Sequence, residues 1–133
     1  MKTLSQFIKE DLQDVEFSFR QITKRPDSCE WQEDKGAKHY EIELLGSGRL
    51  VRFFYSMGSA CGKPKKDEVI ACLVMDSLCA EEKFEDFCNN YGYSSDSIKA
   101  KGIWEMCKET ASKLLTVVGI DRFETMQSLE NDI

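Results

Sequence analysis

The most apolar stretch of the chain, residues 67–80 (DEVIACLVMDSLCA), predicts a buried helix. Apolar side chains fall on nearly every side of such a helix. Asp67 and Glu68 stand at its start, where the helix dipole favours acidic residues. Because a helix of this kind needs cover on most of its surface, we expect a sheet on one face and other helices opposite. The rest of the fold is predicted around this element.

Alternating apolar and polar residues predict three strands before the buried helix. Residues 15–22 (VEFSFRQI) place their valine and phenylalanines on one face, which predicts a half-buried strand. Residues 39–45 and 49–57 alternate in the same way and are separated by a Gly-Ser-Gly turn at 46–48. This arrangement predicts an antiparallel hairpin, which completes a three-stranded sheet.

An apolar repeat of three to four residues predicts the remaining helices. The segments with this repeat are residues 2–13, residues 81–91 and a long stretch that runs to about residue 118. Residues 121–129 show the repeat only weakly, as an optional short helix that the predicted order leaves out. Ser95 or Asp96 is the predicted N-cap of the long helix. The predicted order α-β-β-β-α-α-α describes an α+β domain over residues 1–133, with helices on one face of an antiparallel sheet. Its sheet-forming part covers about 15–57 and its helical part about 67–129.

Two further features qualify this picture. The polar connection over residues 23–38 contains Trp31, which either folds back on the core or forms an exposed anchor. The chain has six cysteines. Cys72, Cys79, Cys88 and Cys107 lie within helical apolar patterns, so we predict buried free thiols rather than disulfides.

Composition and charge narrow the class of protein. Hydrophobic residues make up 41% of the chain and charged residues 32%, which is typical of a globular domain. No apolar run has the length of a membrane span, and the N-terminus lacks the features of a signal peptide, so we predict a cytoplasmic protein. The net charge is −6. Residues 1–66 carry 12 basic and 10 acidic side chains, whereas residues 67–133 carry 6 and 14.

Two blocks of sequence resemble a family of small proteins encoded by tailed phages and prophages. The first block joins FYSMGS at 54–59 to Pro64 and to DEVIACL at 67–73. The second joins FEDF at 84–87 to YGYSSDS at 91–97 and Lys99-Ala100. The resemblance covers about residues 38–120 and implies a phage or prophage origin. It implies no catalytic activity.

The residue types that enzymes need are poorly placed in this sequence. His39 is the only histidine and begins a predicted strand. The glycines near Lys63 do not form a phosphate-binding loop, because Pro64 follows the lysine. The chain has no CxxC spacing for a zinc site. We therefore predict a non-enzymatic protein with no catalytic residue, no metal and no cofactor.

The acidic helical half favours a protein-binding function. Acidic residues and two tyrosines gather in one segment and form the candidate interface: Glu81, Glu82, Glu85, Asp86, Tyr91, Tyr93 and Asp96. Acidic groups steer a protein toward basic partners, and tyrosines are enriched at binding hot spots. With the phage resemblance, this predicts an accessory protein that binds a host protein. Inhibition of a defence complex that binds nucleic acid, of the CRISPR or restriction type, is the specific expectation.

Two alternatives remain open from the sequence. The order α-β-β-β-α resembles a double-stranded-RNA-binding domain, with candidate contacts at His39, Arg49, Arg52, Lys63, Lys65 and Lys66. This reading is weakened by the outward-facing Glu41 and Glu43 and by the acidic helical half. The other alternative is a self-associating structural or assembly factor, because the sequence leaves the oligomeric state open.

Overall fold

The computed structural model describes residues 2–23, 36–58 and 60–131. Its elements in chain order are α1 (Leu4–Asp11), β1 (Glu16–Ile22), β2 (Lys38–Gly46), β3 (Arg49–Met57), α2 (Lys66–Leu78), α3 (Phe84–Tyr91), α4 (Ile98–Val118) and α5 (Ile120–Asn131). The predicted α+β class is confirmed. The order differs from the prediction by α5, because the weak pattern over residues 121–129 does form a helix. That helix buries Phe123 and Met126 in the core.

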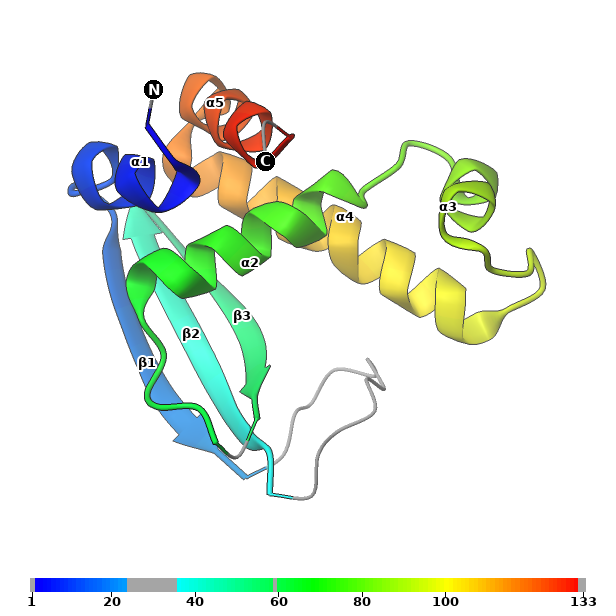
Figure 1. Ribbon diagram of the computed structural model, residues 1–133, viewed down its shortest axis with the longest axis horizontal. Coiled ribbons are helices and arrows are strands. Elements are labelled where there is room, and N and C mark those ends of the chain that lie inside the picture. Colours follow the sequence, from blue (N-terminus) through cyan, green and yellow to red (C-terminus); the bar gives the residue numbers. More distant parts are fainter. Residues whose placement is uncertain (1, 24–35, 59, 132–133) are drawn as a thin grey trace.

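The sheet is antiparallel, with β2 between β1 and β3. Side chains of alternate residues point to opposite faces, which we call the inner and outer faces. The inner face carries the buried apolar side chains of β2, namely Tyr40, Ile42 and Leu44. Helices α2 and α4 lie on this side of the sheet, with α1 and α5 beside them near one end (Figure 1). The main hydrophobic core fills the space between the two layers.

The buried helix α2 is covered less completely than the sequence suggests. It packs against α1, α4 and α5. On the sheet side, the hydroxyl of Tyr55 donates to the sulfur of Cys72 at 3.5 Å. Met75, however, is 53% exposed, which contradicts the expectation of cover on nearly every side. Helix α2 therefore has more apolar side chains than the fold buries, because one side of it remains at the surface of the helical layer.

The starts of α3 and α4 lie later than the sequence predicts. Helix α3 begins at Phe84 rather than at residue 81, because Lys83 at its N-cap has an extended backbone. Ser97, rather than Ser95 or Asp96, caps α4, and its hydroxyl accepts a hydrogen bond from the amide of Ala100 at 3.1 Å.

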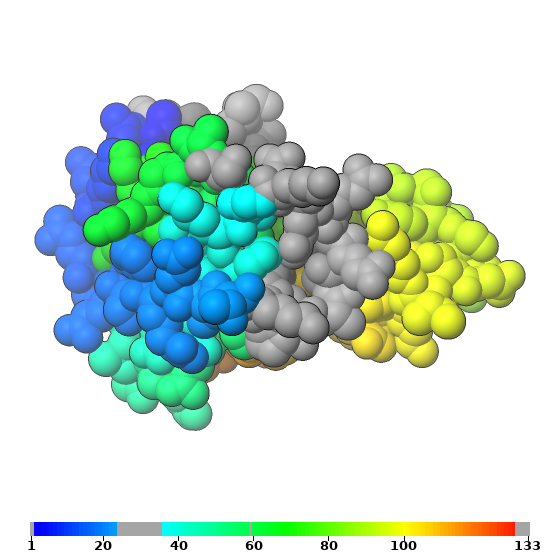
Figure 2. Space-filling model, turned by 90° about the horizontal axis from the view of Figure 1, so that it is seen from below, coloured from blue at the N-terminus to red at the C-terminus, as the bar shows by residue number. Residues whose placement is uncertain are grey.

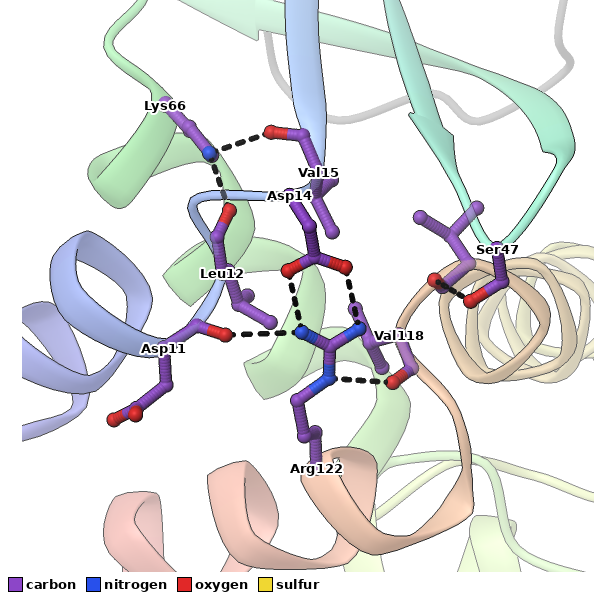
Figure 3. A network of polar contacts seen from close by, with 9 residues as sticks. Asp11, Leu12, Asp14, Val15, Ser47, Lys66, Val118 and Arg122 are labelled. Atoms are coloured by element: carbon purple, nitrogen blue, oxygen red, sulfur yellow. Dashed lines mark hydrogen bonds and ion pairs between the residues drawn. The ribbon is translucent and has the colours of Figure 1, made fainter.

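The N-terminal segment is held to the helical layer by a polar network (Figure 3). Arg122 of α5 donates to both carboxylate oxygens of Asp14, at 2.6 and 3.0 Å, and to the carbonyl of Asp11. The ammonium of Lys66 donates to the carbonyls of Leu12 and Val15 at 2.6 and 2.5 Å. These contacts satisfy carbonyl groups at the end of α1 and in the segment between α1 and β1. The network therefore fixes where β1 starts.

The cysteines that the structure describes are all free thiols. Cys88 and Cys107 are buried, whereas Cys72 and Cys79 are half-buried and Cys61 is exposed. The prediction of free thiols is confirmed for these positions, although two of them are less buried than expected. Trp31 and Cys29 lie outside the described residues.

Candidate functional site

Helix α3 and the first half of α4 form a small lobe at one end of the molecule. We define the α3 lobe as residues 79–107. It has its own hydrophobic cluster, in which Phe87, Ala100, Ile103 and Cys107 are buried. In Figure 1 α3 lies away from the sheet, and in Figure 2 the yellow-green and yellow residues of the lobe project from one end. A surface that projects in this way is accessible to a partner.

Aromatic rings build the interior of the α3 lobe. The ring of Phe87 stacks on Tyr93, with centroids 5.6 Å apart and planes at 11°, and it meets Tyr91 at 5.1 Å. Phe84 packs on Trp104 at 5.4 Å. The indole nitrogen of Trp104 donates to the carbonyl of Glu81 at 2.7 Å. This bond fixes the extended residues before α3 against α4, so the lobe is held by side chains from both helices.

The acidic candidates lie along the surface of this lobe. The lobe, residues 79–107, carries six acidic and three basic side chains, a net charge of −3. Glu81 accepts a hydrogen bond from Asn90 at 3.0 Å and is half-buried. Glu82, Glu85 and Asp86 are exposed and form no ion pair with a residue that the structure describes.

Part of this acidity has a structural role. Glu85 and Asp86 lie in the first turn of α3, where they complement the helix dipole. Each contributes up to about 1 kcal/mol there when exposed. Glu82 precedes the helix and has no such role, and Asp96 lies in the turn before α4, also exposed. Charge at Glu82 therefore has no structural role among the residues that the structure describes.

Two apolar side chains are exposed on the same lobe. Tyr91 is 45% exposed, and a hydrogen bond with the Cys79 thiol, aided by burial and nearby acidic charge, raises the pKa of its phenol to about 12. Ile98, the first residue of α4, is 89% exposed. Ile98 is not among the candidates predicted from the sequence. Its exposure could have been predicted, because Ile98 stands two residues before Ala100 and so lies on the opposite side of the helix from the apolar stripe.

Tyr93, by contrast, is half-buried against Phe87. The structure thus brings the acidic candidates, Tyr91 and Ile98 onto one lobe, and places Tyr93 mainly in its interior. An aromatic and an aliphatic side chain among unpaired carboxylates can contact an apolar spot on a partner while the carboxylates meet basic groups around it.

The six basic candidates do not form one surface. His39 and Arg49 lie near opposite ends of the hairpin, seven residues apart along β2 in register, or roughly 23 Å. Arg52 donates to Glu43 at 3.0 Å on the outer face. Lys63 and Lys65 are exposed in the loop before α2. The structure therefore scatters the residues that the nucleic-acid reading requires.

Two of these residues have structural partners that the sequence did not reveal. Lys66 is half-buried and gives its ammonium to backbone carbonyls, and desolvation lowers its pKa. The Nδ1 atom of His39 lies 2.8 Å from the Ser56 hydroxyl. Lys66 in particular is unavailable to a phosphate without breaking the contacts that start β1.

Neither a protein-family model, nor a curated protein, nor a solved structure matches the chain significantly. Within residues 2–23, 36–58 and 60–131, no group of three or more histidine, cysteine, aspartate or glutamate side chains is arranged to hold a metal ion. No helix in that part of the chain has the length and apolarity to cross a membrane.

Proposed function

We propose that the chain is a non-enzymatic binding protein and that the α3 lobe is its working surface. The observation that carries this proposal is that one projecting lobe combines exposed Tyr91 and Ile98 with carboxylates that form no ion pair with a described residue. Isolated exposed apolar residues are common on protein surfaces. Here they lie on a lobe whose acidic side chains form no ion pair with a described residue, which is the pattern of an interface with a basic partner.

A basic protein surface is the partner that this lobe fits best. Carboxylates attract Arg and Lys and raise the rate of encounter, and the apolar side chains then exclude water at the centre of the contact. The resemblance of residues 38–120 to phage and prophage proteins supports a host protein as that partner. A host defence protein with a basic channel for nucleic acid is the specific proposal, since spaced carboxylates can occupy sites meant for phosphates.

Nucleic acid itself is the less favoured partner. Phosphate binding needs several unpaired basic groups on one surface. The outer face instead pairs Arg20 with Glu41 and Arg52 with Glu43, which leaves it close to neutral. Lys63 and Lys65 alone give a small basic spot. No contact in the structure favours this alternative over the α3 lobe.

A tagged pull-down from a bacterial lysate tests the proposal, with and without nuclease. The lobe variant carries Glu82→Gln, Glu85→Gln and Asp86→Asn. The matched control removes three acidic charges elsewhere, at Glu68, Asp121 and Glu124, which are exposed on α2 and α5. A third variant, Ile98→Ser, changes a side chain that the fold does not bury.

We expect one abundant partner whose recovery does not depend on nuclease treatment. It should bind the control variant as strongly as it binds the wild type. The lobe variant and the Ile98→Ser variant should each bind it at least about tenfold more weakly, the range of a single hot-spot residue. Equal binding by the wild type and the lobe variant would refute the proposal. If the partner is no longer recovered after nuclease treatment, nucleic acid mediates the binding, and the loop that carries Lys63 and Lys65 becomes the candidate binding surface.

A further inference from the structure

Strand β1 leaves one of its edges open. It pairs with β2 alone, and no described strand lies along its other edge. It is the outermost ribbon on its side of the sheet (Figure 1). Five of its seven residues are exposed. The edge therefore presents backbone donors and acceptors to solvent over roughly 23 Å.

Edge strands usually carry features that prevent pairing with other chains, and β1 lacks the common ones. Its sequence from Glu16 to Ile22 contains neither proline nor lysine. The register with β2 is continuous from one end to the other, so β1 contains no bulge. Its one basic side chain, Arg20, bends toward β2 and donates to Glu41 through Nε and Nη2, both at 3.1 Å. The strand is thus competent to accept another strand.

The sequence of β1 is also complementary to itself about Ser18. If two copies pair antiparallel with Ser18 opposite Ser18, then Phe17 lies opposite Phe19 of the second copy, and Glu16 lies opposite Arg20. Each of these pairs occurs twice by symmetry. The phenylalanines meet on the inner face and the charges meet on the outer face, because side chains alternate along each strand.

We propose that two copies of the chain associate through β1 as a symmetric antiparallel pair, centred on Ser18, that joins their sheets into one. The partner is therefore a second copy of this chain. Symmetric dimers of this isologous kind are the commonest protein oligomers. The proposal is independent of the α3 lobe, which lies at the other end of the molecule (Figure 1).

The pairing uses groups that have no partner among the described residues of a single chain. Phe19 is 39% exposed, although its ring contacts Phe17 at 5.9 Å and Tyr40 at 5.8 Å. A second copy would extend this aromatic cluster. Glu16 forms no ion pair with a described residue, and Nη1 of Arg20 has no partner among them. These two groups are the ones that the proposed register brings together.

Neighbouring symmetric registers do not give the same match. Centring the pair on Phe19 would place Arg20 opposite Ser18 and would form no charge pair. Centring it on Phe17 would place Arg20 opposite Asp14, whose carboxylate is already held by a guanidinium of α5. The Ser18-centred register alone pairs both aromatic and both charged positions.

A charge exchange between two variants tests the interface by sedimentation equilibrium. In Glu16→Arg homodimers each new arginine would face Arg20, and in Arg20→Glu homodimers each new glutamate would face Glu16. We expect each variant to dimerise about tenfold more weakly than the wild type, since two attractive pairs become repulsive. An equimolar mixture should recover dimers, because a heterodimer has an opposite-charge pair at both positions.

A cross-linking test fixes the register and does not depend on those charges. In a Cys61→Ser background, Ser18→Cys places two thiols on the symmetry axis, where the backbone spacing of paired strands allows a disulfide. Gln21→Cys is the control, because the two copies of residue 21 would lie six positions apart, or roughly 20 Å. Under mild oxidation we expect covalent dimers from Ser18→Cys and few from Gln21→Cys.

Three results would overturn the proposal. The first is a wild-type chain that stays monomeric up to millimolar concentration. The second is a single charge variant that dimerises as strongly as the wild type, or a mixture of the two variants that does not regain dimers. Equal cross-linking at positions 18 and 21 would exclude the Ser18-centred register.

Discussion

Gly46 ends β2 at the point where the hairpin meets the end of α4. It is buried, and a methyl group on its Cα would lie 2.8 Å from Cγ1 of Val117, 2.9 Å from the carbonyl oxygen of Val117 and 3.1 Å from Cγ2 of Val15. The next residue, Ser47, donates its hydroxyl to the same carbonyl of Val117 at 3.0 Å. We therefore predict that Gly46→Ala destabilises the fold, because it separates the hairpin from α4.

The size of the effect follows from two opposing terms. Forcing a methyl group into a packed site costs about 1–3 kcal/mol of unfolding free energy. Here one obstacle is a backbone oxygen, which a change of side-chain rotamer cannot remove. Alanine also lowers the conformational entropy of the unfolded chain relative to glycine, which stabilises the folded state by about 0.4–1 kcal/mol. We expect a net loss of about 1–2 kcal/mol.

Urea unfolding followed by circular dichroism measures this loss, and Gly102→Ala is the matched control. Gly102 lies inside α4, and a methyl group there would meet nothing within 4 Å. Alanine is favoured over glycine inside a helix, so this variant should gain up to about 1 kcal/mol. The reasoning is refuted if Gly46→Ala is as stable as the wild type, or if both substitutions change stability in the same direction.

Three further substitutions test the contacts that position the elements. Lys66→Met should cost about 1–3 kcal/mol in urea unfolding, because two buried carbonyls lose their donor, whereas Lys65→Met should change little. Ser97→Ala should cost about 1 kcal/mol and Ser95→Ala almost nothing, since only the former caps α4. Asp14→Asn should cost less than about 1 kcal/mol near neutral pH, because the pair that it breaks is exposed to solvent. A hydrogen bond from its guanidinium partner lowers the pKa of Asp14 from 3.8, so this contribution exists above that pH and is lost as the pH falls further; comparing unfolding at neutral and acid pH checks it.

The hairpin shows how far local sequence determines structure here. Strand β3 has the predicted bounds, and β2 extends only one residue further at each end. Alternation and a glycine turn act between neighbouring residues, so both are visible in the sequence. Phe19 is different, because the same alternation predicts a buried ring, and the position of β1 at the sheet edge leaves it 39% exposed.

Features that depend on distant contacts were not visible in the sequence. Nothing local shows that the ammonium of Lys66 would satisfy carbonyls more than 50 residues earlier. Helix α5 has a weak apolar pattern, and its position depends on Arg122 reaching back to the segment before β1. In the α3 lobe, the acidic candidates were identified from composition, but their lack of ion-pair partners among the described residues became visible only in the folded chain.

The central claim is that the α3 lobe binds a protein partner. Hydrogen–deuterium exchange of the chain, free and bound to the partner recovered by the pull-down, locates the binding surface directly. We predict slower exchange in residues 81–98 of the complex and unchanged exchange in β2 and β3. Slower exchange confined to the sheet or to the loop before α2, with the α3 lobe unchanged, would contradict the account.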